Sequence, residues 1–415
     1  MNFLALLVLA WGCAPPVAEP APAVAAFDAR AAFDEYERTL RADYAYLERD
    51  DFDVDAHLAR TRVAAEQAAD RAAFRRVLHR STFAFADPHL LVAPLDDADP
   101  NVWPTSADLA VTFVGGRFVV ADVRAGSAAD GAGVRPGWIA AGIGGRSVAA
   151  CSEELLAGVS APTERQRGYT ATLCVNGARA GSRALEFLVD DQPRALELAN
   201  PREYAERVAK LGPLGVEVRG RVGIVRFNNS LGRQDTIAAF DAAMQGLMGL
   251  EGVVLDLRNT PSGGNTDVAR GILGHFVAGP RPYQVHEIPA VLRSTTVPRR
   301  FVEYVLPREP VFGGRVAVLG GRWTGSMGEG LVIGLHAAAG ARTFVSEMGD
   351  LLGALHVQEL ALSGAVLELG AEALFHVDGT PRADYVGDVR LAAADRDADG
   401  GDPALTAALA WLAGA

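Results

Sequence analysis

The stretch from Arg315 to Gly340 constrains the fold of this chain more than any other part of the sequence. A short apolar run, Val316 to Leu319, predicts a buried strand, and the residues from Met327 onward have helical spacing. Between them Ser326 lies on a sharp strand-to-helix turn, where a nucleophile would meet the positive end of a helix dipole and unpaired N–H groups. The same Ser-x-x-Glu sequence, ending at Glu329, is also an ordinary helix capping box. The turn alone therefore leaves two interpretations open, a nucleophile and a helix cap.

Strands and helices alternate through the whole C-terminal half of the chain. Expected strands are Val222–Phe227, Gly252–Leu257, Arg315–Leu319 and Thr343–Ser346, and expected helices between or after them are Asp235–Met248, Thr266–Phe276 and Met327–Ala339. This alternation predicts an α/β core whose functional loops lie at the ends of the strands.

One such loop follows the second expected strand. Asp256-Leu257-Arg258 leads into Pro261-Ser262-Gly263-Gly264 and then into a helix. Adjacent glycines before a helix can present backbone N–H groups to an anion or an oxyanion. The loop lacks the Gly-Lys-Ser/Thr of a phosphate-binding loop, and a simple tight turn is the alternative interpretation.

The N-terminal residues predict export. Residues 1–13 contain an apolar run of about ten residues, shorter than the roughly 20 that a membrane span needs and typical of a signal peptide. Gly12-Cys13 resembles a bacterial lipoprotein cleavage site, which would lipidate Cys13; the alternative is a plain secretory signal with an incidental cysteine. Residues 14–26 form a Pro/Ala-rich linker. We expect a periplasmic protein or a cell-surface lipoprotein attached to the membrane through Cys13.

Residues 27–100 have a helical pattern. An amphipathic stripe precedes two further helices, which begin near Val54 and Arg71; the stripe consists of Phe33, Tyr36, Leu40, Tyr44 and Leu47. Asp87-Pro88 ends the helical pattern, and His89 follows directly. A single histidine at such a turn is more often structural than catalytic.

Residues 101–192 read as an all-β module with one helix. A strand over Phe118–Val123, a short helical segment and Pro136-Gly137-Trp138-Ile139 before a Gly-Gly hairpin resemble a PDZ domain. PDZ-like modules bind an extended peptide as an added strand. The alternative is a β module that only packs against its neighbours.

Cysteines and charge exclude several classes of ligand. Cys151 and Cys174 would either form a disulfide or stay as two buried thiols, and neither has metal-ligand spacing. The segment from Asp395 resembles an EF-hand loop but has Thr406 where the bidentate glutamate belongs. A net charge of −12 argues against nucleic acid as a partner. We expect no metal and no cofactor.

Taken together, the motifs resemble the S41 peptidase family of C-terminal-processing and tricorn-like serine proteases. The matching stretches, in chain order, are FADPHLLV, DLRNTPSGG, TGSMGEGL, FVSEMGDLLG and PRADYVGDV. The resemblance implies a multidomain α+β fold: an N-terminal helical bundle, a PDZ-like β module and, over residues 193–415, an α/β catalytic core of ClpP/crotonase-like type. It also implies a serine endopeptidase whose PDZ-like module captures polypeptide.

The resemblance further implies which residues act. The family's Ser-Lys branch has a lysine after the element that here is Glu347–Gly353, but the one lysine of this chain is Lys210, far from that position. The Ser-His branch remains, with His89 as general base to Ser326, and its acidic residue falls on Asp384. The oxyanion donors implied are the N–H groups of Gly263 or Gly264 and of Met327; His376 is the best rival base.

We therefore predict an exported serine endopeptidase that acts on polypeptides through a Ser326 acyl-enzyme. Two other classes stay open. One is a binding protein that keeps the fold without a competent triad, because Pro88 stands where the tricorn-like enzymes have a serine and Asp384 is shorter than the usual glutamate. The other is a Ser-His esterase acting on small substrates, because a Ser-His pair and an oxyanion hole do not specify an amide. The sequence does not determine the oligomeric state.

Overall fold

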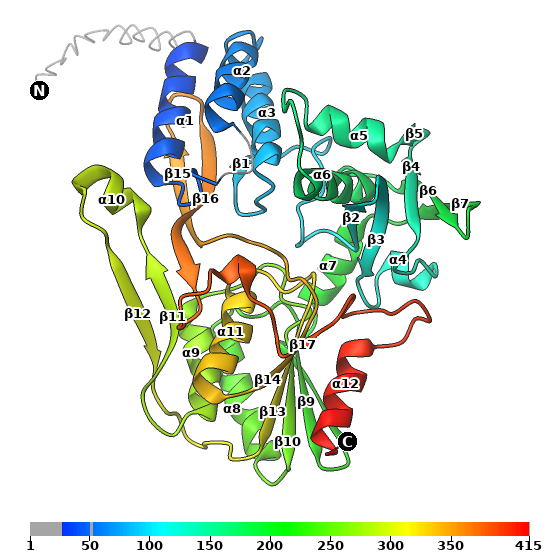
Figure 1. The fold of residues 1–415 in the computed structure, drawn as a ribbon, viewed down its shortest axis with the longest axis vertical. Coiled ribbons are helices and arrows are strands. Elements are labelled where there is room, and N and C mark those ends of the chain that lie inside the picture. The colour runs from blue at the N-terminus through cyan, green and yellow to red at the C-terminus, as the bar shows by residue number, and fades with distance from the viewer. Residues whose placement is uncertain (1–26, 50–52, 415) are drawn as a thin grey trace, which may run out of the picture.

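The computed structural model describes residues 27–49 and 53–414. The predicted signal peptide, Cys13 and the 14–26 linker lie outside these residues. Figure 1 shows three regions: helices α1–α3 at one end, a green β module beside them, and an α/β core below both. In the described part of the chain, none of the helices combines the length and the apolar composition that crossing a bilayer requires.

Three helices follow the predicted N-terminal pattern: α1 (Ala29–Asp43), α2 (Val54–Glu66) and α3 (Arg71–Thr82). Each is preceded by a capping aspartate, whose carboxylate accepts a hydrogen bond from an otherwise unpaired N–H of the first turn. Their hydrophobic core also contains residues 360–371 of a distant hairpin, β15 (Ala354–Leu360) and β16 (Ala365–Phe375). The helical region is thus completed by a segment from the C-terminal half of the chain.

The middle module contains the sheet β2-β3-β4-β6-β7, with β5 beside β4. Its strands are β2 (Leu109–Val114), β3 (Arg117–Val123), β4 (Ile139–Ile143), β5 (Arg146–Ser147), β6 (Arg183–Val189) and β7 (Gln192–Leu198). The expectation of a single helix is wrong, since the module has three: α4 (Ala128–Gly131), α5 (Val148–Leu155) and α6 (Glu164–Asn176). Sequence periodicity missed α6 because several of its buried residues, such as Gln166, Thr170 and Asn176, are polar, so the sequence shows no apolar stripe.

A second six-stranded sheet, in the order β17-β14-β13-β10-β9-β8, forms the α/β core. Its strands are β8 (Leu214–Arg219), β9 (Val222–Phe227), β10 (Gly252–Asp256), β13 (Arg315–Gly320), β14 (Arg342–Val345) and β17 (Val389–Arg390). One face packs on α8 (Asp235–Leu247), α9 (Thr266–Leu273) and α11 (Met327–Ala339), and the other packs on α12 (Pro403–Leu412). The α/β pattern predicted from the sequence is confirmed here. β10 and β13 are parallel neighbours, so the loops after them meet at one edge of the sheet.

A third sheet joins these regions. It has the order β1-β16-β11-β12, with β15 also paired to β16, and includes β1 (Leu91–Ala93), β11 (Arg281–Glu287) and β12 (Arg300–Val305). Helix α10 (Pro289–Thr295) connects β11 to β12 at the end of an arm (Figure 1). Since β1 follows His89 and pairs with β16, this sheet ties the N-terminal region to the core beside the loops of the site.

Candidate active site

The turn at Ser326 is strained and the Ser326 side chain is accessible. Ser326 precedes α11 with φ 51° and ψ −116°, outside the regions that a non-glycine residue ordinarily adopts. The side chain is half-buried, whereas the residues on both sides are buried. A strained backbone that lifts a serine hydroxyl out of a packed loop is the geometry of a nucleophile elbow.

Glu329 holds this turn from within its own helix. Its Oε2 accepts a hydrogen bond from Ser326 N–H at 2.7 Å, and its Oε1 accepts one from Asp350 N–H at 3.0 Å. The capping role predicted for Glu329 is therefore present, together with a second contact that no sequence pattern indicated. Burial raises the pKa of the Glu329 carboxyl to about 7.

The glycine loop after β10 packs directly on the nucleophile. A Cβ atom at Gly263 would lie 2.4 Å from Ser326 Cβ and 2.9 Å from Met327 N, so only glycine fits at this contact. The N–H of Gly263 donates to Thr260 O at 3.0 Å. Among the described residues, the N–H groups of Gly264 and Met327 have no acceptor. Of the two glycines predicted as alternative oxyanion donors, Gly264 thus has the available N–H.

His89 is buried and its ring is oriented by a backbone carbonyl. Nδ1 lies 2.9 Å from Leu352 O, so Nδ1 carries the proton and Nε2 is left with a free lone pair. Burial lowers the pKa of His89 to about 4, and the charge of Arg382 acts in the same direction. The imidazole is therefore neutral at pH 7 and in the tautomer that a general base requires.

Asp87 fixes the backbone on both sides of this contact. Its Oδ1 accepts hydrogen bonds from His89 N–H at 2.9 Å and from Leu352 N–H at 3.2 Å, and its Oδ2 accepts one from the Tyr44 hydroxyl at 2.8 Å. Burial raises the pKa of Asp87 to about 7. The sequence indicated only a helix breaker at this position.

Arg382 connects the nucleophile turn with the segment that orients His89. It donates to Ser326 O at 3.3 Å, to Gly353 O at 3.2 Å and also to Leu351 O. Residues 351–353 therefore contact His89 directly and are connected to Ser326 through Arg382. No hydrogen bond joins Ser326 Oγ to the His89 ring in the described structure.

Asp384 does not take the place predicted for it. It is exposed, in the short 3₁₀ turn Arg382–Asp384, and among the described residues its carboxylate has no hydrogen bond or ion pair. The role of orienting His89, for which Asp384 was the candidate, belongs to Leu352 O. A main-chain carbonyl has no sequence signature, which is why it was missed.

A second arginine reaches the site from the middle module. Arg165 of α6 donates two hydrogen bonds to Asp350 Oδ2, at 2.9 and 3.1 Å, and one to Ala86 O at 2.7 Å. One guanidinium group therefore contacts both the loop before His89 and the loop before Leu352. No motif in the sequence pointed to this residue.

The other histidines lie elsewhere. His275 has both ring nitrogens occupied, one by Pro310 O and the other by Asp241. The rings of His376 and His336 are 5.5 Å apart, and His336 is ten residues beyond Ser326 on α11, or about 15 Å along the helix. His376, the best rival base from the sequence, is thus remote from the nucleophile.

A cavity of about 600 Å³ opens beside these residues. Its wall includes Pro88 next to His89, Glu329 next to the nucleophile, and Asp384. In the described structure no cluster of His, Cys, Asp or Glu side chains is arranged to hold a metal ion.

Comparison with known proteins finds similarity in structure but not in sequence. No family model and no curated protein matches the sequence. The photosystem II D1 C-terminal processing protease matches with a TM-score of 0.54 and 15% identity over 89% of this chain and 94% of that chain. Mature CPAF matches with a TM-score of 0.60 and 14% identity over 93% of this chain and 95% of that chain. The chain has the fold of these two solved structures over about nine-tenths of its length, which confirms the fold class predicted from the motif resemblance. The low identity leaves the activity of this chain to be argued from the site.

Proposed function

We propose that this protein is a serine peptidase that cleaves polypeptides through a Ser326 acyl-enzyme. The observation that carries the proposal is the pairing of two prepared groups: a strained, accessible serine at a helix N-terminus, and a buried neutral histidine whose Nδ1–H is held by Leu352 O. Both are attached to residues 351–353. The fold shared with the processing protease supports the same chemistry.

In the proposed mechanism, Ser326 Oγ attacks the scissile carbonyl carbon while His89 Nε2 takes the hydroxyl proton. The N–H groups of Gly264 and Met327 donate to the oxyanion of the tetrahedral intermediate. When the C–N bond breaks, His89 gives its proton to the leaving amine. Water then attacks the acyl-enzyme with His89 again acting as base, and Ser326 recovers its proton.

His89 works in this proposal without a carboxylate partner. Leu352 O holds the tautomer and Asp87 holds the backbone, so Asp384 is left outside the catalytic set. The hydrogen bond between Ser326 and His89 would form in the substrate complex, since such contacts often tighten only on binding.

A fluorophosphonate probe tests the nucleophile. We expect the probe to label the wild-type chain and not Ser326→Ala, at equal amounts of folded protein by circular dichroism. Absence of Ser326-dependent labelling would favour the alternative of a binding protein without a competent site. Turnover of small esters but not of unfolded polypeptide would favour the Ser-His esterase.

We also propose that the protein is exported and attached to a membrane through a lipidated Cys13. Besides the signal-like N-terminus, the Cys151–Cys174 disulfide supports an oxidising compartment. Cys13→Ser should move the protein from the membrane fraction to the soluble fraction; an unchanged distribution would contradict lipid attachment.

A further inference from the structure

Strand β2 lies at one end of the middle sheet, so one of its edges has no partner strand. Backbone groups at such an edge are the ones with which an added peptide strand pairs. Capture of polypeptide by the middle module, as predicted from its resemblance to a PDZ domain, requires these groups to be free.

Helix α6 covers this edge with a ladder of polar side chains. Asn176 Oδ1 accepts from Asp108 N–H and Leu109 N–H, at 2.9 and 3.3 Å, and its Nδ2 donates to Leu109 O at 2.8 Å. One turn earlier, the hydroxyl oxygen of Thr172 accepts from Val111 N–H at 2.9 Å and lies 3.1 Å from Val111 O, to which it can donate. These are the bonds that a paired strand would make.

The third contact between α6 and the edge of β2 is made by a glycine. Gly168 is one further turn along α6, and a Cβ atom there would lie 3.3 Å from both Phe113 N and Val111 O. This approach leaves no room for a peptide strand between helix and sheet, because neighbouring strands lie about 4.8 Å apart.

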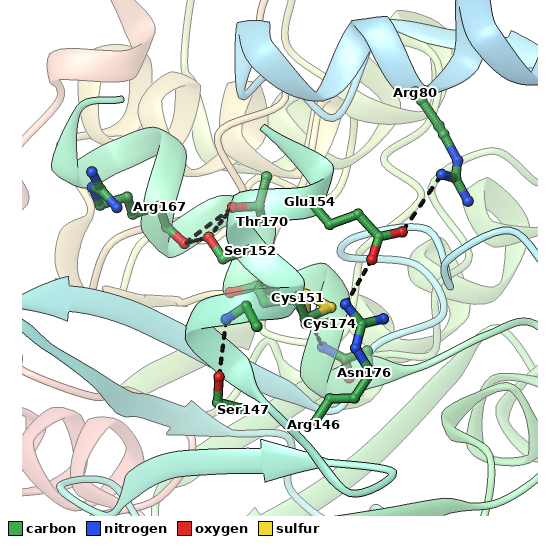
Figure 2. Close-up of a disulfide and its surroundings, with 12 residues drawn as sticks. Arg80, Arg146, Ser147, Cys151, Ser152, Glu154, Arg167, Thr170, Cys174 and Asn176 are labelled. Atoms are coloured by element: carbon green, nitrogen blue, oxygen red, sulfur yellow. Dashed lines mark hydrogen bonds and ion pairs between the residues drawn. A yellow bond between two sulfur atoms is a disulfide. The ribbon is translucent and has the colours of Figure 1, made fainter. Parts of the chain in front are cut away.

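Three contacts on other sides hold α6 in this position. The Cys151–Cys174 disulfide joins it to α5, and Ser152 Oγ lies 2.7 Å from Thr170 Oγ1 between the same two helices (Figure 2). Gln166 Nε2 donates to Ala84 O, in the N-terminal region, at 2.6 Å. The helix is therefore held against α5 and the N-terminal region as well as against β2.

We infer that α6 permanently occupies the peptide-accepting edge of β2, and that polypeptide substrate binds instead in the 600 Å³ cavity at the N-terminal half of α6. This inference rests on the proposed peptidase function and says where its substrate lies. The middle module then acts as one rigid wall of the substrate site.

The position of the cavity fits this role. Residues 110–113 of β2 and Gly168 and Thr172 of α6 line it from the middle module, and residues 345–350 and 382–387 line it from the core. Pro88 and Glu329 place the cavity next to His89 and to the Ser326 turn. Its volume is within the range of about 300–1,000 Å³ that ligand sites occupy.

Hydrogen exchange of the full chain tests this inference. We would add β-casein, an unfolded polypeptide, to Ser326→Ala with its disulfide intact and follow amide exchange by mass spectrometry. We expect exchange to slow about fivefold or more in residues 345–350 and 382–387, while Asp108 and Leu109, the edge residues that do not line the cavity, stay unchanged. Slowing at Asp108 and Leu109, or no slowing in either core segment, would overturn the inference.

Two substitutions add an independent readout on β-casein cleavage. Thr112→Trp should fill the cavity and raise KM about tenfold, equivalent to about 1.4 kcal/mol of binding. Asn176→Ala removes the amide that covers Asp108 and Leu109 and, because Asn176 does not line the cavity, should leave KM within about twofold. The control Asn101→Ala, which removes a buried amide that makes no bond to β2, should do the same. A several-fold lower KM for Asn176→Ala alone would mean that the exposed edge binds substrate, contrary to the inference. Fluorophosphonate labelling of Ser326 does not require the cavity, so it reports failure of the proposed function separately.

Discussion

The nucleophile turn and the His89 turn hold their side chains by different means. Ser326 lies between a strand and a helix that are adjacent in the sequence, and Glu329 of that same helix holds its N–H. His89 is held by Leu352 O, which is 263 residues away. The first geometry is built locally, and the second exists only when distant segments pack together. Substitutions in the distant segments that hold His89 should therefore lower activity while leaving the Ser326 turn nearly unchanged.

The largest expected effect separates the two turns directly. His89→Ala should lower kcat for peptide cleavage by about 10³–10⁴-fold, because the variant lacks the general base of the proposed mechanism. The matched control His376→Ala should keep nearly full activity. Steady-state kinetics with both variants checks the assignment, and the reverse order of effects would mean that the base is the wrong histidine.

Gly263→Ala tests whether the close packing of the glycine loop positions Ser326. The new Cβ would meet Ser326 Cβ at 2.4 Å, and the residue would keep a φ of +62°, so Ser326 must shift. A displacement of that kind should cost about 10²-fold in kcat. Gly313→Ala, at a glycine with no atom within 4 Å of the new Cβ, is the control. Equal activity of both variants would show that the glycine loop does not support the nucleophile.

Arg165→Met tests the long-range support of His89. Without its bonds to Asp350 and Ala86 O, the two loops around His89 lose a shared contact, and kcat should fall about tenfold. The control Arg167→Met removes an arginine from the same helix that lies over the Phe113 ring instead. Because Arg165 also lines the cavity, kcat and KM are measured separately; a change in KM alone would assign it to binding.

The pH dependence tests whether His89 is a buried neutral histidine. Since burial lowers the pKa of His89 from 6.5 to about 4, the imidazole should stay neutral down to about pH 4 to 5. A fall of kcat/KM near pH 7 is expected instead from Asp87 and Glu329, because the pKa of each of these carboxyls is raised to about 7. Between pH 6.5 and pH 4 the His89 ring binds more protons in the unfolded state than in the folded state. The stabilising contribution of neutral His89 to the folded protein is therefore lost as the pH falls through this range. An NMR titration of the His89 ring with a midpoint near pH 6.5, measured while circular dichroism shows folded protein, would contradict the buried neutral histidine.

The smallest expected effect concerns Asp384. Its carboxylate is exposed and makes no hydrogen bond or ion pair among the described residues, so Asp384→Ala should change kcat/KM by less than about threefold. A loss of a hundredfold would show that this carboxylate reaches His89 in the substrate complex.

Much of the core could be predicted from the sequence because its signals are local. The predicted strand Val222–Phe227 and helix Met327–Ala339 match the structure residue for residue. Hydrophobic period and capping residues act over a few positions, so they can be read directly. Helix α6 was missed because its buried polar residues face β2 and other partners that periodicity does not reveal.

The sequence by itself determined the strand–turn–helix that presents Ser326, the glycine loop and the absence of a usable lysine. Only the tertiary structure decided how His89 is oriented, that Gly264 rather than Gly263 has an available N–H, and that α6 covers the edge of β2. The physical reason is that these depend on backbone carbonyl and N–H groups. Every residue carries such groups, so their partners are chosen by packing and leave no trace in the order of the side chains.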